Sequence, residues 1–227
     1  MRRSASENNL ITLTNPYSPI SETYRTLRIN LQYTPGKQTV KAVMVTSSIS
    51  DEGKTTTLSN LAVAYAQEGK GVLVIDADLR NPSLHDVFSQ LNQAGLSDVL
   101  VNKTNWQEAI NDTAIPNLSI LTAGVIPSNP SEMLASKQMA ALIEELKERY
   151  DILLIDTPPV LAVPDPLIVN AYCDGVLLVV AAGKADKETV KKAKASLERV
   201  NARILGAVFN KMNRKDAKHI SDYAYGR

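Results

Sequence analysis

The chain has 227 residues, of which 44% are hydrophobic, so it can bury a sizeable core and wholesale disorder is excluded. Its 25 basic and 24 acidic residues leave a net charge of +1, and no bulk electrostatic attraction toward nucleic acid is expected. The single Cys173 excludes an internal disulfide framework, and no apolar run approaches the roughly 20 residues of a membrane span, which together indicate a soluble, cytoplasmic protein.

Residues 1–36 are expected to form an appendage to the main domain. A polar start is followed by a helical pattern over residues 18–33, and a Pro-Gly pair closes it. Within this pattern Glu22, Arg25 and Arg28 recur at three-residue steps and therefore lie along one helix face. By default such a face is solvated and carries weak surface ion pairs.

Residues 37–216 alternate between short apolar runs and helical patterns. The runs are rich in β-branched residues and suit strands that are buried on both faces of a parallel sheet. The predicted strands are 40–46, 71–75, 118–121, 152–155, 175–180 and 204–209, and the predicted helices include 56–68, 136–150 and 187–201. This alternation predicts an α/β domain with a doubly wound, mostly parallel sheet flanked by helices in three layers.

A phosphate-binding loop is predicted directly after the first strand, in the stretch VMVTSSISDEGKTTT (residues 43–57). Gly53 permits close approach of the backbone, Lys54 brings an ammonium to the β- and γ-phosphates, and the Thr55 hydroxyl can ligate Mg²⁺. The triplet alone also fits a chance strand–turn–helix. The predicted nucleotide-binding residues of this stretch are Ser48, which replaces the usual first Gly, and Asp51, Glu52, Gly53, Lys54, Thr55 and Thr56. The two acidic ones would stand close to a phosphate.

Two further apolar runs end in carboxylates. The stretch VLVIDADLRNP carries Asp76 and Asp78, and the stretch ILLIDTPP carries Asp156. Because strand carboxyl ends line the ligand crevice of a doubly wound sheet, these acids have the geometry to hold Mg²⁺ and to handle a proton. One Asp after a strand is more often a turn or a helix cap. Three in this order, beside a phosphate loop, indicate a nucleotide site.

In their order and form these stretches resemble the bacterial tyrosine kinases (BY-kinases). That family carries a Walker A loop that usually lacks its first Gly, a Walker A′ motif D-x-D-x-R and a Walker B motif ending D-T/S-P-P, and another of its segments is similar to LTAGVIPSNPSEML. The matching residues here are 47–55, 76–80, 156–159 and 121–134. The resemblance runs from about Ile20 to the end of the chain. It departs at Ser50-Asp51, where Pro-Gly is common, and at Asn81, where Lys is common.

The resemblance implies a P-loop NTPase fold of the deviant Walker, MinD-like type, and ATP-dependent phosphorylation of tyrosine with Mg²⁺ as cofactor. Lys54 and Mg²⁺ would neutralise the γ-phosphate, with Thr55 as a direct metal ligand and Asp156 holding the metal or its waters. A tyrosine hydroxyl has a pKa of about 10, so a carboxylate must accept or steer its proton. We assign that role to Asp76 and place Asp78 beside the metal, although the exchanged assignment fits the sequence almost as well.

Two features near the end of the chain also take a role from the resemblance. Asn210, after the last predicted strand, resembles the residue that reads the adenine edge, although an ordinary strand-end turn explains it nearly as well. The tail, residues 217–227, holds Tyr223 and Tyr225 in the stretch HISDYAYGR. In the family such tyrosines are autophosphorylated, usually in trans on a neighbouring subunit. The alternative is a chain end that happens to contain aromatic residues.

Glu22, Arg25 and Arg28 match letter for letter the E-x-x-R-x-x-R motif with which the family joins subunits into a ring, so we favour an oligomer interface over a solvated face. The resemblance also implies a membrane adaptor whose cytoplasmic segment activates the kinase, and a cognate tyrosine phosphatase. It points to regulation of capsule or exopolysaccharide synthesis. A partner is then expected to recruit the protein to the inner face of the cell membrane, and no nucleic acid partner is expected.

Three other functions fit part of the sequence. The main alternative is a ParA/MinD-type ATPase switch without kinase activity, which usually carries a signature Lys where Ile49 stands here. A metabolic phosphotransferase or ligase would need a dedicated small-molecule pocket. A nucleotide-bound scaffold would not transfer phosphate at all. Phosphate that appears on the protein, rather than free in solution, distinguishes the kinase from the switch.

Overall fold

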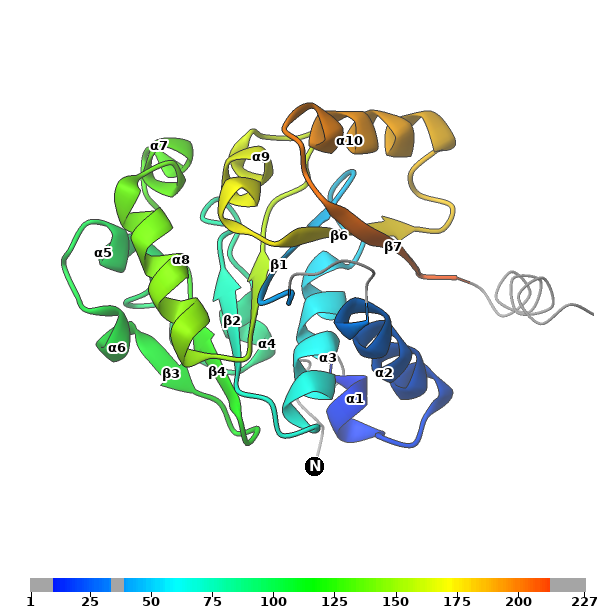
Figure 1. Cartoon of the computed structure of the whole chain (residues 1–227), viewed down its shortest axis with the longest axis horizontal. Coiled ribbons are helices and arrows are strands. Elements are labelled where there is room, and N and C mark those ends of the chain that lie inside the picture. Colours follow the sequence, from blue (N-terminus) through cyan, green and yellow to red (C-terminus); the bar gives the residue numbers. More distant parts are fainter. Residues whose placement is uncertain (1–9, 34–38, 213–227) are drawn as a thin grey trace, which may run out of the picture.

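Seven strands form one central sheet within residues 10–33 and 39–212, the part of the chain that this computed structural model describes (Figure 1). Their order across the sheet is β3-β4-β2-β5-β1-β6-β7. The strands are β1 (Ala42–Ser47), β2 (Val72–Asp76), β3 (Ile110–Asp112), β4 (Leu118–Leu121), β5 (Ile152–Asp156), β6 (Gly175–Ala181) and β7 (Ile204–Asn210). The pair β3–β4 is antiparallel and the other neighbouring pairs are parallel. The predicted doubly wound, mostly parallel sheet is confirmed.

The middle strands are buried on both faces, as their near-continuous apolar runs predict. Every residue of β1, β2, β5 and β6 is buried. The six predicted strands match observed ones, with ends that differ by at most two residues. The edge strand β3 was not predicted because its three residues, Ile-Asn-Asp, are mostly exposed and form no apolar run.

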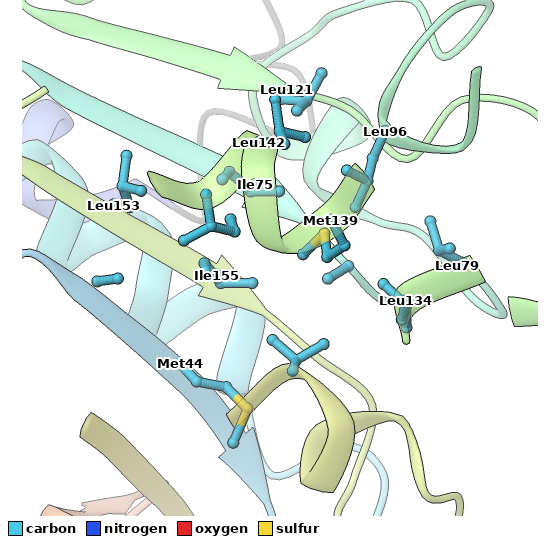
Figure 2. Packing of buried hydrophobic residues seen from close by; sticks show 14 of the residues in the cluster. Met44, Ile75, Leu79, Leu96, Leu121, Leu134, Met139, Leu142, Leu153 and Ile155 are labelled. Carbon is cyan, nitrogen blue, oxygen red and sulfur yellow. The ribbon is translucent and has the colours of Figure 1, made fainter. Parts of the chain in front are cut away.

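Helices cover both faces of the sheet, which gives the predicted three layers (Figure 1). One face packs against α8 (Lys137–Arg149), α9 (Asp165–Val169) and α10 (Lys187–Arg199). Figure 2 shows part of this core, where Met44, Ile75 and Ile155 of the strands gather with Met139 and Leu142 of α8. Short helices lie in the connections: α4 (Leu84–Val87), α5 (Leu96–Leu100), α6 (Trp106–Ala109), α7 (Pro130–Leu134) and a 3-10 turn at Asn170–Tyr172.

The opposite face packs against α3 (Lys54–Ala66), which α1 (Ile11–Thr14) and α2 (Pro19–Gln32) cover in turn. The side chain of Ser18 caps α2 by accepting from the Ser21 amide, and Pro19 occupies the first turn, where its missing N–H is harmless. Because α3 lies between the sheet and α2, ten of its 13 residues are buried. No helix among the described residues combines the length and the apolar character that a bilayer-spanning segment requires.

Candidate active site

Three neighbouring strands bring the predicted acids and the phosphate loop to one edge of the sheet. In the order β2-β5-β1, Asp76 at the end of β2 pairs in register with Asp156 at the end of β5, and the loop after β1 leads into α3 beside them. A cavity of about 700 Å³ opens at this edge. Most of the predicted nucleotide-binding residues line it, namely Asp51, Gly53, Lys54, Thr55, Thr56 and Asn210, and Asp78 lines it as well.

Gly53 shapes the phosphate loop where it enters α3. Its φ of +88° lies in the left-handed region, which favours glycine. A side chain here would also collide with Asn210, because an added Cβ would lie 2.1 Å from Asn210 Nδ2. That amide donates instead to the Glu52 carbonyl at 2.9 Å, so the end of β7 braces the loop. The loop thus presents the N-terminus of the 13-residue helix α3 to the cavity, an arrangement that favours anions.

The two acids of the loop each have partners of their own. Glu52 is fully buried and does not line the cavity. Its carboxylate accepts from the amides of Ile49 and Ala181, each at 3.0 Å, and so fastens the loop to β6. Asp51 has a left-handed φ of 56° at a position where the resembled family commonly has Gly, and its exposed carboxylate pairs with Lys184 at 3.3 Å. Ser48, which replaces the usual first Gly of the loop, is buried, and its hydroxyl has no hydrogen-bond partner among the described residues.

Lys54 lies among the strand-end carboxylates. Its Nζ is 3.1 Å from Asp78 Oδ2 and 3.6 Å from Asp156 Oδ1, with 13% of the side chain exposed. Burial alone would lower the pKa of Lys54, but the carboxylates of Asp156 and Asp78 outweigh burial and raise it, so the ammonium stays charged. Next to it, Thr55 Oγ1 donates to Asp156 Oδ2 at 2.6 Å.

Asp76 lies deeper than the other acids and is held by backbone amides. Its Oδ2 accepts from the amides of Ser83 and Leu84, both at 3.0 Å, and its Oδ1 accepts from the Asp78 amide at 3.2 Å. Burial, reinforced by the neighbouring Asp156 carboxyl, raises the pKa of Asp76 to about 7 despite those amides. Burial likewise raises the pKa of Asp156, against the opposing effect of Lys54 and of the Thr55 hydroxyl. Asp78, in contrast, borders the cavity directly.

Arg80 of the same segment fixes the loop after β2 to two distant helices. Its guanidinium donates to both oxygens of Asp165, at 2.8 and 3.0 Å, and to Ser131 Oγ at 3.0 Å. Ser131 in turn donates to Asp165 Oδ1 at 2.6 Å. Although burial acts in the opposite direction, the hydrogen bonds from Arg80 and Ser131 lower the pKa of Asp165. Because Asp165 starts α9 and Ser131 lies in α7, this network positions the segment that carries Asp78.

The donor set around Lys54 suits Mg²⁺, a cation that prefers oxygen ligands. Asp156 Oδ1 is buried and accepts no hydrogen bond from the described residues, and the Thr55 hydroxyl and Asp78 lie close by. Within those residues no group of three or more His, Cys, Asp or Glu side chains is arranged to hold a metal by itself. Phosphate oxygens and water would therefore have to complete the ligand set, as in many nucleotide sites.

The remaining predicted residues lie away from the cavity. Glu22 and Arg25 form an ion pair on α2, and Arg25 also donates to the Pro16 carbonyl at 2.6 Å. Arg28 turns inward, where it lies 3.1 Å from Glu68 and only 15% of its side chain is exposed. The predicted acceptors Tyr223 and Tyr225 lie outside the described residues.

Five residues that line the cavity were not predicted as site residues: Ser50, Asn81, Ser83, Pro159 and Lys211. Ser50 and Pro159 lie inside recognised motifs, and the other three follow a predicted site residue or motif by one to three positions, so the local sequence held a signal for each. Asp165 and Ser131 carry no such signal, because they reach Arg80 only through the tertiary fold.

Comparisons with known proteins agree with this geometry. Residues 41–206 match the AAA_31 family, described as an AAA domain. The tyrosine-protein kinase YwqD of Bacillus subtilis is 44% identical over 224 residues, which cover 99% of this chain and 93% of that protein. The putative tyrosine-protein kinase CapB of Staphylococcus aureus is 41% identical and covers 87% of this chain and 86% of its own length.

Solved structures extend the similarity to three dimensions. The kinase domain of the Escherichia coli tyrosine kinase ETK superposes with a TM-score of 0.88 and 33% identity, over 91% of this chain and 81% of that one. The septum site-determining protein MinD of Pyrococcus horikoshii is more distant, with a TM-score of 0.65 and 24% identity over 79% of this chain and 76% of that one, a likeness that shows the fold alone. The kinase interpretation is therefore favoured over the ATPase switch. The family match and the near full-length identity to tyrosine-protein kinases show that this chain belongs to the bacterial tyrosine kinase family of P-loop enzymes.

Proposed function

We propose that the chain transfers the γ-phosphoryl group of ATP to tyrosine hydroxyls, including Tyr223 and Tyr225 of a neighbouring copy, and thereby regulates capsule or exopolysaccharide synthesis. One observation carries the proposal. Lys54 and the Thr55 hydroxyl, at the start of α3, lie beside the carboxylates that follow or end β2 and β5. The distances from Lys54 Nζ and Thr55 Oγ1 to the nearest oxygens of Asp78 and Asp156 are 2.6 to 3.6 Å. Phosphoryl transfer requires charge neutralisation and positioning, which this set supplies.

Nucleotide binding would change the partner of Lys54. The amides of the phosphate loop and the start of α3 would hold the phosphates, and the Lys54 ammonium, now paired with Asp78, would pair with the γ-phosphate instead. Mg²⁺, held by Thr55 and by Asp156 or its waters, supplies further neutralisation of the phosphate oxygens when bound. Asp78 then loses its cationic partner and is free to accept a proton, so nucleotide binding itself would prepare the carboxylate. Asn210 would lie at the end of the site that holds the adenine ring.

Either Asp76 or Asp78 fits the sequence as the acceptor of the tyrosine proton. Their surroundings in the structure differ. Asp78 lines the cavity and accepts from Lys54 there, whereas Asp76 is fully buried and uses both of its oxygens to bind three backbone amides. A substrate hydroxyl would have to displace one of those amides to reach Asp76. We therefore favour the exchanged assignment, in which Asp78 meets the tyrosine and Asp76 positions the loop.

Replacing each carboxylate by its amide tests that choice. We expect Asp78→Asn to lower transfer to tyrosine by about 10²–10⁴-fold. It should lower the melting temperature less than Asp76→Asn does, because Asp78 accepts from one backbone amide and Asp76 from three. We expect Asp76→Asn to destabilise the fold by about 1–3 kcal/mol, because one NH₂ group would face amide donors in a buried place. Asp156→Asn should weaken Mg-nucleotide binding most. Phosphotyrosine yield, fluorescent-nucleotide titration and thermal melting provide the three measurements.

The opposite pattern would identify Asp76 as the proton acceptor. In that case Asp76→Asn would have the melting temperature of the parent protein but lose phosphoryl transfer, while Asp78→Asn would retain transfer. Equal loss of nucleotide binding in both variants would assign both residues to the metal.

The kinase proposal is tested most directly by intact-mass analysis after incubation with Mg-ATP. Added mass in steps of roughly 80 Da on the peptide that contains residues 217–227 is the expected result. The matched control replaces Tyr223 and Tyr225 by Phe. Release of free phosphate without any change in protein mass would support the ATPase switch instead.

Partners follow from the same proposal. Glu22, Arg25 and Arg28 would join copies into a ring, a membrane adaptor would recruit and stimulate the kinase at the inner face of the membrane, and a tyrosine phosphatase would reset it. Of these three, Glu22 is the most available to another copy, with 63% of its side chain exposed. Arg28 would contribute mainly by holding α2 on α3.

A further inference from the structure

Ser83 occupies a helix N-cap position but does not use its hydroxyl as a cap. It directly precedes α4, and its side chain makes no capping hydrogen bond. A serine at this position usually accepts from an amide of the first turn. Here Asp76 Oδ2, from the end of β2, accepts from the amides of Ser83 and Leu84 at 3.0 Å each. The Ser83 hydroxyl is therefore available for another partner.

That partner is the Thr55 hydroxyl. Ser83 Oγ lies 3.2 Å from Thr55 Oγ1, and Ser83 borders the same cavity as Lys54 and Asp78. Thr55 Oγ1 donates its own proton to Asp156 Oδ2 at 2.6 Å. A hydroxyl has a single proton, so in this pair Ser83 must donate and Thr55 must accept. The direction of the Thr55 hydroxyl is thus fixed from two sides.

We propose that Ser83 is a positioning residue of the nucleotide site, which orients the Thr55 hydroxyl for Mg²⁺. A threonine oxygen has one proton and two lone pairs. Asp156 takes the proton, Ser83 occupies one lone pair, and the second lone pair is left for a cation. Hydrogen bonds that orient a ligand in this way typically affect metal affinity strongly. The inference rests on the proposed Mg-nucleotide function.

The test compares Ser83→Ala, Ser83→Thr and the control Ser128→Ala, which removes an exposed hydroxyl outside the cavity. Fluorescent ADP is titrated against each protein at several Mg²⁺ concentrations and in EDTA. We expect Ser83→Ala to raise the Mg²⁺ concentration needed for half-maximal binding by about fivefold, with no change in the EDTA affinity. Ser83→Thr and Ser128→Ala should match the parent protein.

Thermal melting of the ligand-free proteins separates positioning from capping. Because the Ser83 side chain caps nothing, Ser83→Ala should melt within about 2 °C of the parent, whereas loss of a true N-cap lowers stability by about 1 kcal/mol and melting by several degrees. A lower melting temperature, an unchanged Mg²⁺ requirement, or equal weakening in EDTA would each overturn the inference. If the ADP affinity of the parent protein did not depend on the Mg²⁺ concentration, the result would contradict the proposed function and the inference together.

Discussion

Lys54→Met is expected to lower tyrosine phosphorylation by on the order of 10²–10³-fold or more, because it removes the ammonium that lies at the start of α3 and can neutralise phosphate charge during transfer. Methionine keeps nearly the same side-chain length and apolar stem. In the ligand-free protein Lys54 is 3.1 Å from Asp78 and 3.6 Å from Asp156, so the substitution also removes the cation that these acids share.

The fold is expected to survive this loss. The ammonium opposes the rise in the pKa of Asp156 that burial causes, so without it that carboxyl takes up a proton more readily and the buried charge is relieved. Lys187→Met is the matched control, since Lys187 is exposed on α10 and does not border the cavity. The measurements are phosphotyrosine yield and far-UV circular dichroism. A folded Lys54→Met protein that phosphorylates tyrosine at the parent rate would contradict the site assignment.

The sequence predicted the parts of this site whose signal is local. Buried parallel strands leave continuous apolar runs, and the residues that end such runs, Asp76 and Asp156, are brought to one edge by the topology of any doubly wound sheet. The loop before α3 could be found because Gly53 must adopt a conformation that other residues avoid. The family resemblance was carried by these same stretches, and the comparisons confirm it.

Other parts depend on contacts that the chain order does not reveal. Glu52 looked like an acid beside a phosphate, but its carboxylate binds an amide of β6 that is 129 residues away in the sequence. Arg80 and Asp165 are 85 residues apart, and each has an ordinary local surrounding. The contact between Ser83 and Thr55 could not be predicted, because it depends on a loop after β2 meeting the start of α3, and on a serine N-cap that makes no capping hydrogen bond. Side-chain partners across long separations are decided by packing, which periodicity does not encode.

The geometry of α2 bears on how one copy would reach the tail of another. Glu22 and Arg25 lie on the outer side of α2, whereas Arg28 binds Glu68 and the Ala64 carbonyl of the same chain. Replacing Arg28 would therefore disturb the packing of α2 on α3 as well as any interface. Glu22→Ala with Arg25→Ala is the cleaner way to weaken a ring, because it removes the outer ion pair of α2 and leaves the contacts of Arg28 with Glu68 and Ala64 in place.

Mixing two complementary variants is expected to transfer all tail phosphate to one chain. Lys54→Met keeps both tail tyrosines but lacks transfer, whereas Tyr223→Phe with Tyr225→Phe keeps transfer but lacks those acceptors. If phosphorylation occurs in trans, each variant alone gives almost no tail phosphate, and the mixture phosphorylates the Lys54→Met chain, as intact mass would show.

Adding Glu22→Ala and Arg25→Ala to both chains should reduce this transfer by about tenfold or more at micromolar concentration, because the acceptor must then be found by diffusion. Each phosphate adds roughly two negative charges, so phosphorylated tails should repel one another, and light scattering should report smaller assemblies after reaction. Tail phosphate on the parent protein at a rate that does not depend on its concentration, together with an unmodified Lys54→Met chain in the mixture, would contradict trans phosphorylation and leave the kinase assignment standing.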